Sequence, residues 1–339
     1  MKVTEVVKLA KQFGINVRKT KRIIKGVYRI EASNGKSFAL KSMAYSSAQI
    51  RWMDNSLQGL RRAGFTQLSW RNPSDTEGKK LFVRSSGTPY ILTPWIQGRW
   101  PSPQSREDMR TCGVTLAHFH RTGLIAPSKN SVMNMIGMWP AELHIKHKTL
   151  ARHINLSRKS HHLNDLHSVL RAYGAELLDY SRQAQVILQK SLYSQECKKA
   201  EQLCHLCHGD GGPTNFILNP NGSFLIDFET LRIDLRAYDL YRVIYNSCKD
   251  HEWKYSIAQA ILDGYHSISR LNATDLELTK AWLRFPRTTV LLLNKYHRSS
   301  SLEIKSWIAQ QVPAALKSER RVTAFLKELD LYKKQIAID

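Results

Sequence analysis

The residues best suited to chemistry lie between positions 208 and 227. A His-Gly-Asp tripeptide ends at Asp210, Asn215 follows five residues later, and Asp227 comes after a further apolar run. Two short apolar runs flank an Asn-Pro-Asn-Gly turn within 216–226, which predicts a hairpin of two strands. A hairpin returns the chain to its starting point, so we expect Asn215 and Asp227 to lie close together beside Asp210.

This set of side chains suits phosphoryl transfer. An aspartate on a tight loop can orient an attacking hydroxyl and accept its proton, which is the role predicted for Asp210. Carboxylate and amide oxygens are the ligands that Mg²⁺ prefers, so Asn215 and Asp227 are the predicted metal ligands. We group His208 with Asp210 as a catalytic-loop residue that shapes the loop together with Gly209. The alternative is a polar loop followed by a strand-ending acid, and the ordered set is more specific than the tripeptide alone.

The segment resembles the catalytic segment of the aminoglycoside phosphotransferase/choline kinase branch of the protein-kinase-like fold. That branch has His-Gly-Asp where protein kinases have His-Arg-Asp. Within the branch, the chain most resembles the bacterial spore-coat CotS family, and the resemblance covers nearly the whole length. The supporting segments are Phe-Ala-Leu-Lys at 38–41, Tyr-Ile-Leu-Thr-Pro-Trp-Ile-Gln-Gly-Arg at 90–99, Ile-Asp-Phe-Glu at 226–229 and Phe-Pro at 285–286.

The resemblance implies an α+β fold of the two-lobed, protein-kinase-like type. Residues 1–95 would form a small N-terminal lobe with an antiparallel sheet and one helix for nucleotide binding. Residues 96–339 would form a larger, mainly helical C-terminal lobe that carries the catalytic loop, the metal site and acceptor-binding helices. We therefore expect a cleft near residue 95.

The resemblance also implies a nucleotide site for ATP or GTP with Mg²⁺. Lys41 would be the strand lysine that pairs with the α- and β-phosphates; alternatively it is a surface lysine of a basic chain. Segment 93–98 would be the hinge between the lobes, reading the adenine edge through the carbonyl of Pro94 and the N–H of Ile96. Because proline has no N–H, Pro94 can only accept there. Glu229 is expected to support the metal site from behind Asp227.

Two features depart from the family pattern. The turn before the second strand contains a single glycine, Gly26, so a glycine-rich phosphate cover is missing, and Lys25 is left to supply charge. The helix after Lys41 contains no Glu to pair with that lysine, and Asp54 or Gln49 would have to substitute. These departures leave open a pseudokinase that binds nucleotide without turnover.

The remaining elements follow from periodicity and turn signals. We expect a helix over 1–13, strands over 16–24, 27–32 and 37–42 with an Asn34-Gly35 turn, a helix from Ser46 or Ser47 to about 63, and strands at 81–84 and 90–93. His118 and His120 are predicted to be structural, and Asp239 to cap a helix and brace the catalytic loop. Further helices are predicted over 105–121, 163–200, 254–269, 273–284, 288–296, 301–310 and 312–335, the last beginning at Pro313.

The chain carries a formal net charge of +23 with a pI of about 9.9. Such a surface attracts polyanions, including nucleic acid, acidic proteins, anionic spore-coat components and phosphorylated ligands, although no motif supports nucleic acid. A basic, His-rich stretch at 143–162 is the predicted place for an acidic or phosphorylated substrate. The alternative is a solvated basic face with no specific partner.

Several classes of protein are disfavoured. No apolar run is long enough to span a membrane, and the charged N-terminus does not resemble a signal peptide, so we expect cytoplasmic synthesis without secretion. The resemblance adds the mother cell as the site of synthesis and the spore coat as the destination. The Cys-x-x-Cys-His pattern at 204–208 matches a haem attachment signature, but this would need export, and zinc would need more ligands.

Three functions remain in competition. The first is a spore-coat phosphotransferase acting on an unidentified hydroxyl-bearing acceptor: a small molecule, a saccharide or a coat component. The second is a small-molecule kinase of the aminoglycoside, sugar or choline type unrelated to spores, although the basic charge argues against a polycationic aminoglycoside. The third keeps the fold without turnover, as a pseudokinase or a structural coat protein. The three oxygen-bearing side chains favour an active enzyme.

Overall fold

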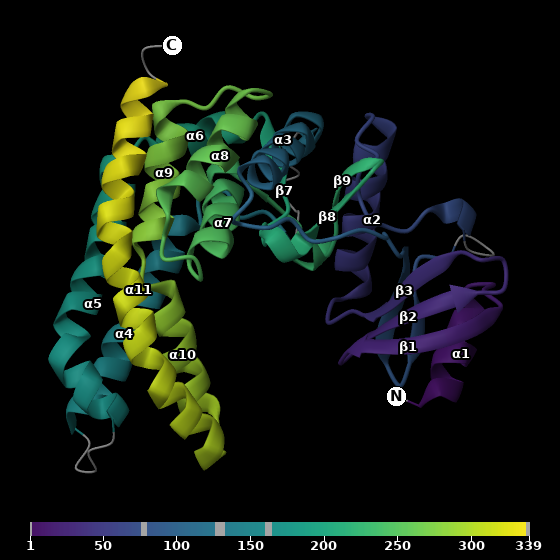
Figure 1. Ribbon diagram of the computed structural model, residues 1–339, viewed down its shortest axis with the longest axis horizontal. Coiled ribbons are helices and arrows are strands. Elements are labelled where there is room, and N and C mark those ends of the chain that lie inside the picture. The colour runs from purple at the N-terminus through teal and green to yellow at the C-terminus, as the bar shows by residue number, and fades with distance from the viewer. Residues whose placement is uncertain (1, 76–79, 126–132, 160–164, 337–339) are drawn as a thin grey trace.

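The computed structural model describes residues 2–75, 80–125, 133–159 and 165–336. The chain forms a small sheet-rich part and a larger, mainly helical part (Figure 1). The predicted α+β, kinase-like fold is therefore confirmed. None of the helices in these ranges is long and apolar enough to cross a membrane.

The sheet-rich part is a five-stranded antiparallel sheet in the order β1-β2-β3-β5-β4. The predicted Asn34-Gly35 turn joins β2 to β3, and Gly35 takes a φ of +81°, which glycine tolerates best. Helix α1 precedes the first strand, and helix α2 lies between β3 and β4 in the sequence. The bounds of these elements are α1 Val3–Gln12, β1 Val17–Ile24, β2 Val27–Ala32, β3 Ser37–Ser42, α2 Ser47–Arg62, β4 Val83–Ser85 and β5 Thr88–Pro94.

Buried and partly exposed side chains alternate along β2, which shows which face of the sheet is covered. Tyr28, Ile30 and Ala32 are buried while the residues between them are partly exposed, as expected for a strand with one covered face. The apolar side of α1, including Leu9 and Phe13, packs into the same cluster. Strand β3, which carries Lys41, is thereby held in the middle of a rigid sheet.

Helix α2 belongs to a different apolar cluster. Ser46 caps the helix in a reciprocal capping box with Gln49, as the predicted start at Ser46 or Ser47 requires. The buried side chains Ile50, Met53 and Leu57 join the cluster that continues through the helical part. Helix α2 therefore connects the sheet to the rest of the molecule.

The helical part surrounds two small β elements. A three-stranded sheet has the order β10-β7-β6, and β8 and β9 form the hairpin predicted between Asn215 and Asp227. The elements are α3 Arg106–Thr122, β6 Leu124–Ile125, α4 Trp139–Lys159, α5 Asp165–Lys190, α6 Tyr193–Ala200, β7 Cys204–Cys207, β8 Phe216–Asn219, β9 Gly222–Leu225, β10 Arg232–Asp234, α7 Arg236–Cys248, α8 Tyr255–His266, α9 Ala273–Arg284, α10 Arg287–Arg298 and α11 Leu302–Gln335.

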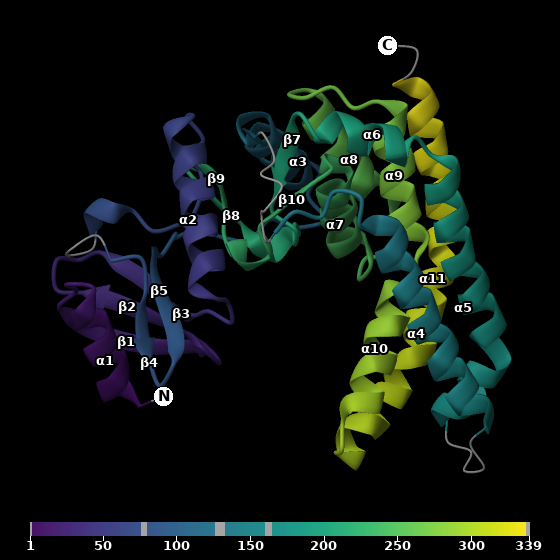
Figure 2. The ribbon, with the colours of Figure 1, turned by 180° about the vertical axis from the view of Figure 1, so that it is seen from behind.

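The β8–β9 hairpin links the two parts of the molecule. Leu225 pairs with Leu68, which follows α2, and Leu218 exchanges backbone hydrogen bonds with Arg99, which follows β5. Figure 2 shows this hairpin reaching from the helical side toward α2. The segment that carries Asn215 and Asp227 is consequently fixed against the sheet-rich part.

One helix prediction is wrong. The segments 301–310 and 312–335 form one helix, α11, with Pro313 inside it. Proline removes one backbone hydrogen bond, but Val312 and Leu316 on either side are buried, and this burial offsets the loss. The helices predicted over 163–200 are present as α5 and α6.

Candidate active site

The catalytic loop leaves β7 through a conformation that requires glycine. Gly209 has a φ of +82°, and a Cβ there would lie 2.2 Å from the carbonyl oxygen of Thr230. The hydroxyl of Thr230 in turn donates to the carbonyl of His208 at 2.8 Å. The backbones of the loop and of the segment after Asp227 therefore run in close contact.

His208 is fully buried and both of its ring nitrogens are engaged. Nε2 lies 2.8 Å from the carbonyl oxygen of Ile226, so it carries the proton, and Nδ1 accepts the N–H of Asp210 at 3.3 Å. The ring also packs against Phe228. These contacts tie the loop to the end of β9. They indicate that His208 positions Asp210 and does not transfer a proton to or from a bound molecule.

Asp239 braces the loop from below. Its carboxylate accepts the N–H groups of His208 and Gly209 at 2.6 and 2.7 Å and bonds Nε2 of His120 at 3.0 Å, with Tyr265 on the other side of that imidazole. Burial raises the pKa of Asp239, but the hydrogen bond and charge of His120, the charge of His208 and the N–H of Gly209 together outweigh it and hold the pKa below the usual value. The predicted bracing role is present, while the predicted cap is wrong because α7 already begins at Arg236.

The Asp239→Asn variant should be strongly destabilised. Asparagine keeps one acceptor oxygen and turns an NH₂ group toward a backbone N–H, leaving buried donors unpaired. We expect a loss of about 3 kcal/mol in the free energy of unfolding, measured by urea denaturation. The matched variant Asp179→Asn, on an exposed part of α5, should change stability little. Equal stabilities for the two variants would contradict the bracing role.

His120, Cys207 and Asp239 also place one candidate metal-ligand atom each within 4.8 Å of one another. The carboxylate of Asp239 is already occupied by two backbone N–H groups and His120. The thiol of Cys207 lies near backbone carbonyls of 234 and 235, and burial raises its pKa well above the usual value. Because these hydrogen bonds already use the carboxylate of Asp239, we assign this group a structural role.

Asp210 lies at the tip of the loop with its side chain 42 % exposed. Arg242 donates to Oδ1, and the amide of Asn246 approaches the same oxygen at 3.3 Å. Among the described residues both of these contacts use Oδ1 and not Oδ2. Burial lowers the pKa of Arg242, but the electrostatic interactions with Tyr241 and Asp210 more than offset this effect. The net pKa lies above the usual value, so the guanidinium stays charged.

Arg242 and Asn246 were not predicted from the sequence. They lie on one face of α7 together with Asp239, at spacings of three and four residues. This helical spacing is the signal that could have found them, because it presents all three side chains to the catalytic loop.

Asn215 is oriented by Asp210. Its Nδ2 donates to the backbone carbonyl of Asp210 at 2.7 Å, and this hydrogen bond does not use the amide oxygen Oδ1. The carbonyl of Asn215 accepts the N–H of Ile226 at 3.0 Å, and Ile226 directly precedes Asp227. The hairpin thus brings the amide and the second acid together, as the sequence predicted.

Asp227 meets Lys41, 186 residues away in the sequence. The lysine Nζ lies 2.5 Å from the carboxylate of Asp227 and 2.8 Å from that of Glu229. Burial lowers the pKa of Lys41, but these two carboxylates more than compensate and raise it above its usual value. Asp227 itself adopts a left-handed conformation with a φ of +65°, which turns its side chain toward β3.

Neither substitute proposed for the missing helix Glu contacts Lys41, so that prediction is wrong. Asp54 is buried and bonds Nε1 of Trp70 at 2.8 Å and Nε of Arg71 at 2.7 Å. Gln49 is used in the capping box of α2, where its Oε1 accepts the N–H of Ser46 at 3.0 Å. Glu229 takes the place of a helix partner for Lys41.

The predicted hinge follows β5, which ends at Pro94. The N–H of Trp95 donates to Ser37 on β3, and the carbonyl of Pro94 accepts the hydroxyl of Ser69 at 2.8 Å. A carbonyl oxygen has two lone pairs, so this contact uses only part of the acceptor capacity of Pro94. Ile96 is partly buried at the start of the connection to the helical part.

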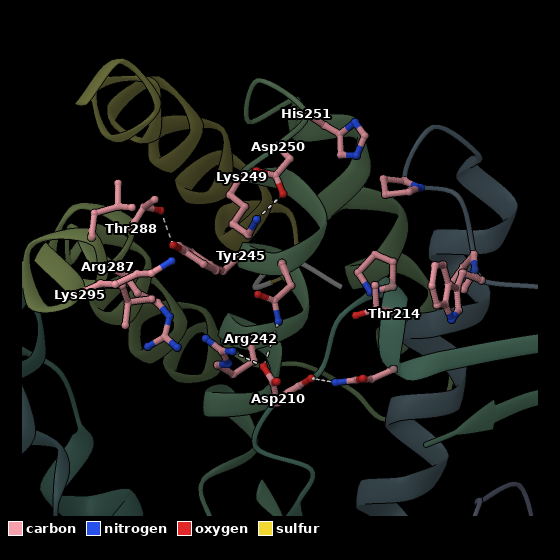
Figure 3. Close-up of a pocket in the computed structure, with 18 of the residues that line it drawn as sticks. Asp210, Thr214, Arg242, Tyr245, Lys249, Asp250, His251, Arg287, Thr288 and Lys295 are labelled. Carbon is pink, nitrogen blue, oxygen red and sulfur yellow. Dashed lines mark hydrogen bonds and ion pairs between the residues drawn. The ribbon is translucent and has the colours of Figure 1, made fainter. Parts of the chain in front are cut away.

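A cavity of about 750 Å³ opens beside Asp210 (Figure 3). Its walls come from the connection at 100–103, the loop at 213–215, the end of α7 and one face of α10. Asp210 and Arg242 lie at its floor, from which the free oxygen of Asp210 can reach a bound molecule. The cavity has the size of a small-molecule site.

Together, these features define a kinase-like phosphotransferase fold in which Asn215 contacts Asp210, and Asp227 and Glu229 pair with Lys41. The model of the phosphotransferase enzyme family (APH) matches residues 24–282, and the chain therefore belongs to that family. No curated protein matches the sequence at a significant level.

Solved structures show the same fold. An aminoglycoside phosphotransferase from Alicyclobacillus acidocaldarius is 18% identical, with a TM-score of 0.78, covering 95% of this chain and 96% of that one. A spectinomycin phosphotransferase in complex with ADP and spectinomycin is 18% identical, with a TM-score of 0.69 and coverages of 94% and 99%. An amicoumacin kinase in complex with AMP-PNP and Ca²⁺ is 14% identical, with a TM-score of 0.62 and coverages of 95% and 94%.

Proposed function

We propose that this protein transfers the γ-phosphoryl group of ATP or GTP to a hydroxyl of a small, hydroxyl-bearing acceptor. The observation that carries the proposal is that one hairpin begins at Asn215, which contacts Asp210, and leads to Asp227, which pairs with Lys41, beside a cavity large enough for such an acceptor. Phosphoryl transfer needs positioning and charge neutralisation more than covalent chemistry, and this set supplies both.

Asp210 acts as the proton acceptor in this scheme. Its Oδ1 is held by Arg242 and Asn246, so Oδ2 has a fixed direction toward the acceptor hydroxyl. The contacts of His208 and Asp239 keep the loop that carries Asp210 in place. Positioning of this kind accounts for much of the rate in phosphotransferases.

Asn215 and Asp227 offer hard oxygen ligands of the kind Mg²⁺ binds, and Glu229 lies next to them. When bound, Mg²⁺ would neutralise charge on the nucleotide phosphates. Lys41 pairs with the carboxylates of Asp227 and Glu229 here, and it would exchange part of that pairing for phosphate oxygens. These residues fit a metal-bound nucleotide, because Lys41 already lies beside the proposed metal ligand Asp227.

The nucleotide would lie between the proposed lobes 1–95 and 96–339, with the base at the hinge. We assign its recognition to the carbonyl of Pro94 and the N–H of Ile96. The spectinomycin phosphotransferase with ADP and the amicoumacin kinase with AMP-PNP and Ca²⁺ support nucleotide and divalent metal binding by this fold. The three oxygen-bearing side chains favour turnover over a pseudokinase.

The spore-coat assignment is a finer part of the proposal and rests on the sequence resemblance to the CotS family. It places synthesis in the cytoplasm of the mother cell and the product in the coat, with a saccharide or coat component as acceptor. Sporulation-timed expression and recovery of the protein in the coat fraction would support it. Constant expression during growth and absence from the coat would instead favour a small-molecule kinase unrelated to spores.

The experiment for phosphotransferase activity measures ADP release from MgATP in the presence of a panel of hydroxylated compounds. Phosphorus NMR of the reaction mixtures then detects any phosphorylated product. We expect ADP release to rise with at least one acceptor and a new phosphate-ester resonance to appear with it. Wild-type protein that binds MgATP but yields no product with any acceptor class would favour the pseudokinase.

A further inference from the structure

The cavity next to Asp210 has an uneven charge distribution. Asp210 pairs with Arg242, and Asp250 pairs with Lys249, so these four charges cancel. Two further cations, Arg287 and Lys295, line the same cavity from α10. Within the described ranges no carboxylate lies within 4.0 Å of either of these two side chains, and the cavity therefore carries an excess of positive charge.

Arg287 and Lys295 share one face of α10. They are eight residues apart, with Leu291 between them, so all three side chains point to the same side of the helix. Figure 3 shows both cations on the α10 side of the cavity, with Asp210 and Arg242 at its floor. An acceptor that presents a hydroxyl to Asp210 would thus meet these cations with its other end.

The carboxyl of Glu319, which lies behind the start of α10, does not cancel the positive charge of the cavity. Glu319 of α11 is fully buried behind α10, where Oε1 accepts the N–H of Thr288 at 3.2 Å. Burial raises the pKa of Glu319 to about 8, so its carboxyl is mostly protonated near neutral pH. Arg287 instead lies over the ring of Tyr245, and Lys295 over that of Trp307 at 4.7 Å.

The cavity also exposes aromatic faces. Trp100 and Trp307 both line the cavity and are 62% and 48% exposed, and Trp307 lies next to Lys295. Aromatic faces pack well against the C–H faces of sugar rings, and indole rings bury large areas at binding sites. Exposed tryptophans that line a cavity of this size indicate a ligand with a ring or a carbon skeleton, not a free inorganic ion.

We infer that the acceptor is an anionic polyol: a sugar-like molecule that carries a phosphate or carboxylate group for Arg287 and Lys295 and a hydroxyl for Asp210. This inference rests on the proposed function and names the substrate class of the same cavity. Charge-assisted hydrogen bonds to the two cations select the anion, and the same cations repel polycationic acceptors such as aminoglycosides.

The test compares four matched probes by isothermal titration calorimetry in saturating Mg²⁺ and AMP-PNP: glucose 6-phosphate, glucuronate, glucose and glucosamine. We expect at least one of the two anions to bind about tenfold or more tightly than glucose, and glucosamine to bind no better than glucose. Preference for one anion identifies phosphate or carboxylate as the recognised group. Binding of glucose or glucosamine as tight as that of both anions, or no binding of any probe, would overturn the inference.

Two variants assign the preference to the two cations. In Arg287→Gln/Lys295→Gln the advantage of the anion should disappear. It should persist in Arg298→Gln/Lys317→Gln, which removes the same charges from exposed positions outside the cavity. An undiminished preference in the first variant overturns the inference.

A second readout uses wild-type protein alone. The affinity for the anionic probe should fall as NaCl is raised, while the affinity for glucose should not, because salt screens charges in an open cavity. The two proposals can fail independently. If AMP-PNP with Mg²⁺ does not bind while the anion preference persists, the proposed phosphotransferase function is contradicted and the inference about the anion site is not.

Discussion

The Asp210→Asn variant should lose nearly all phosphotransferase activity. The amide cannot accept the acceptor's proton at neutral pH, and removal of a general base typically costs between about 10² and 10⁴ in rate. The substitution also leaves the buried guanidinium of Arg242 without its counter-charge, which disturbs the floor of the cavity. The measurement is the rate of acceptor-dependent ADP release from MgATP.

A matched control separates chemistry from stability in that experiment. Asp179→Asn makes the same change on exposed α5, far from the catalytic loop in sequence, and should keep wild-type turnover. The melting temperature shift on adding MgATP shows whether Asp210→Asn still folds and binds nucleotide. If Asp210→Asn folds, binds MgATP and turns over at a rate similar to that of Asp179→Asn, then Asp210 is not the base.

The Asp227→Asn variant should lose its response to the metal. Asp227 is the only carboxylate among the two proposed metal ligands, and its charge is the main attraction for Mg²⁺ at that point. Metal ions supply several kcal/mol of transition-state stabilisation, so we expect turnover to fall by about 10³. Nucleotide binding should become nearly independent of Mg²⁺, as measured by calorimetry with and without the metal.

Glu229→Gln provides the comparison for Asp227→Asn. Glutamine at 229 removes one of the two carboxylates that hold Lys41 but leaves Asp227 in place. Its effect on turnover should be clearly smaller. In Asp227→Asn, Glu229 remains to pair with Lys41, so the variant should fold. A larger loss of metal dependence in Glu229→Gln than in Asp227→Asn would reverse the assignment of the metal ligand.

Local signals were sufficient for the central segment. The tripeptide ending at Asp210, the hairpin turn after Asn215 and the strand before Asp227 all have strong sequence signatures, because turn and strand preferences act over a few residues. The same holds for the first three strands and thus for the place of Lys41. The contact between the segments that carry Asn215 and Asp227 followed from the hairpin geometry.

Residues that act across long sequence separations were not predictable in the same way. Arg242 and Asn246 reach the catalytic loop only because α7 packs beneath it, and the choice of Glu229 over Asp54 as partner of Lys41 depends on how α2 is rotated. Asp54 faces the segment 70–71 because a buried arginine and an indole N–H need an acceptor there. Tertiary packing decides such pairings.

At Pro313 the local sequence preference for a helix start is outweighed by tertiary packing. Proline commonly marks the start of a helix, which is why a break was expected there. In the structure α11 continues through it, since apolar residues on both sides are buried against neighbouring helices. This continuous helix packs against α10, which carries Arg287 and Lys295 of the cavity beside Asp210.

The most direct test of the central claim is a thermal-shift titration of wild-type protein with ATP, with and without Mg²⁺. Ligand that binds the folded state at 100 times its Kd adds about 2.7 kcal/mol of stability, which raises the melting temperature by several degrees. We predict this rise with ATP and Mg²⁺ together, and a much smaller one when EDTA removes the metal. An unchanged melting temperature at all ATP and Mg²⁺ concentrations would contradict a metal-nucleotide site formed by Lys41, Asn215 and Asp227.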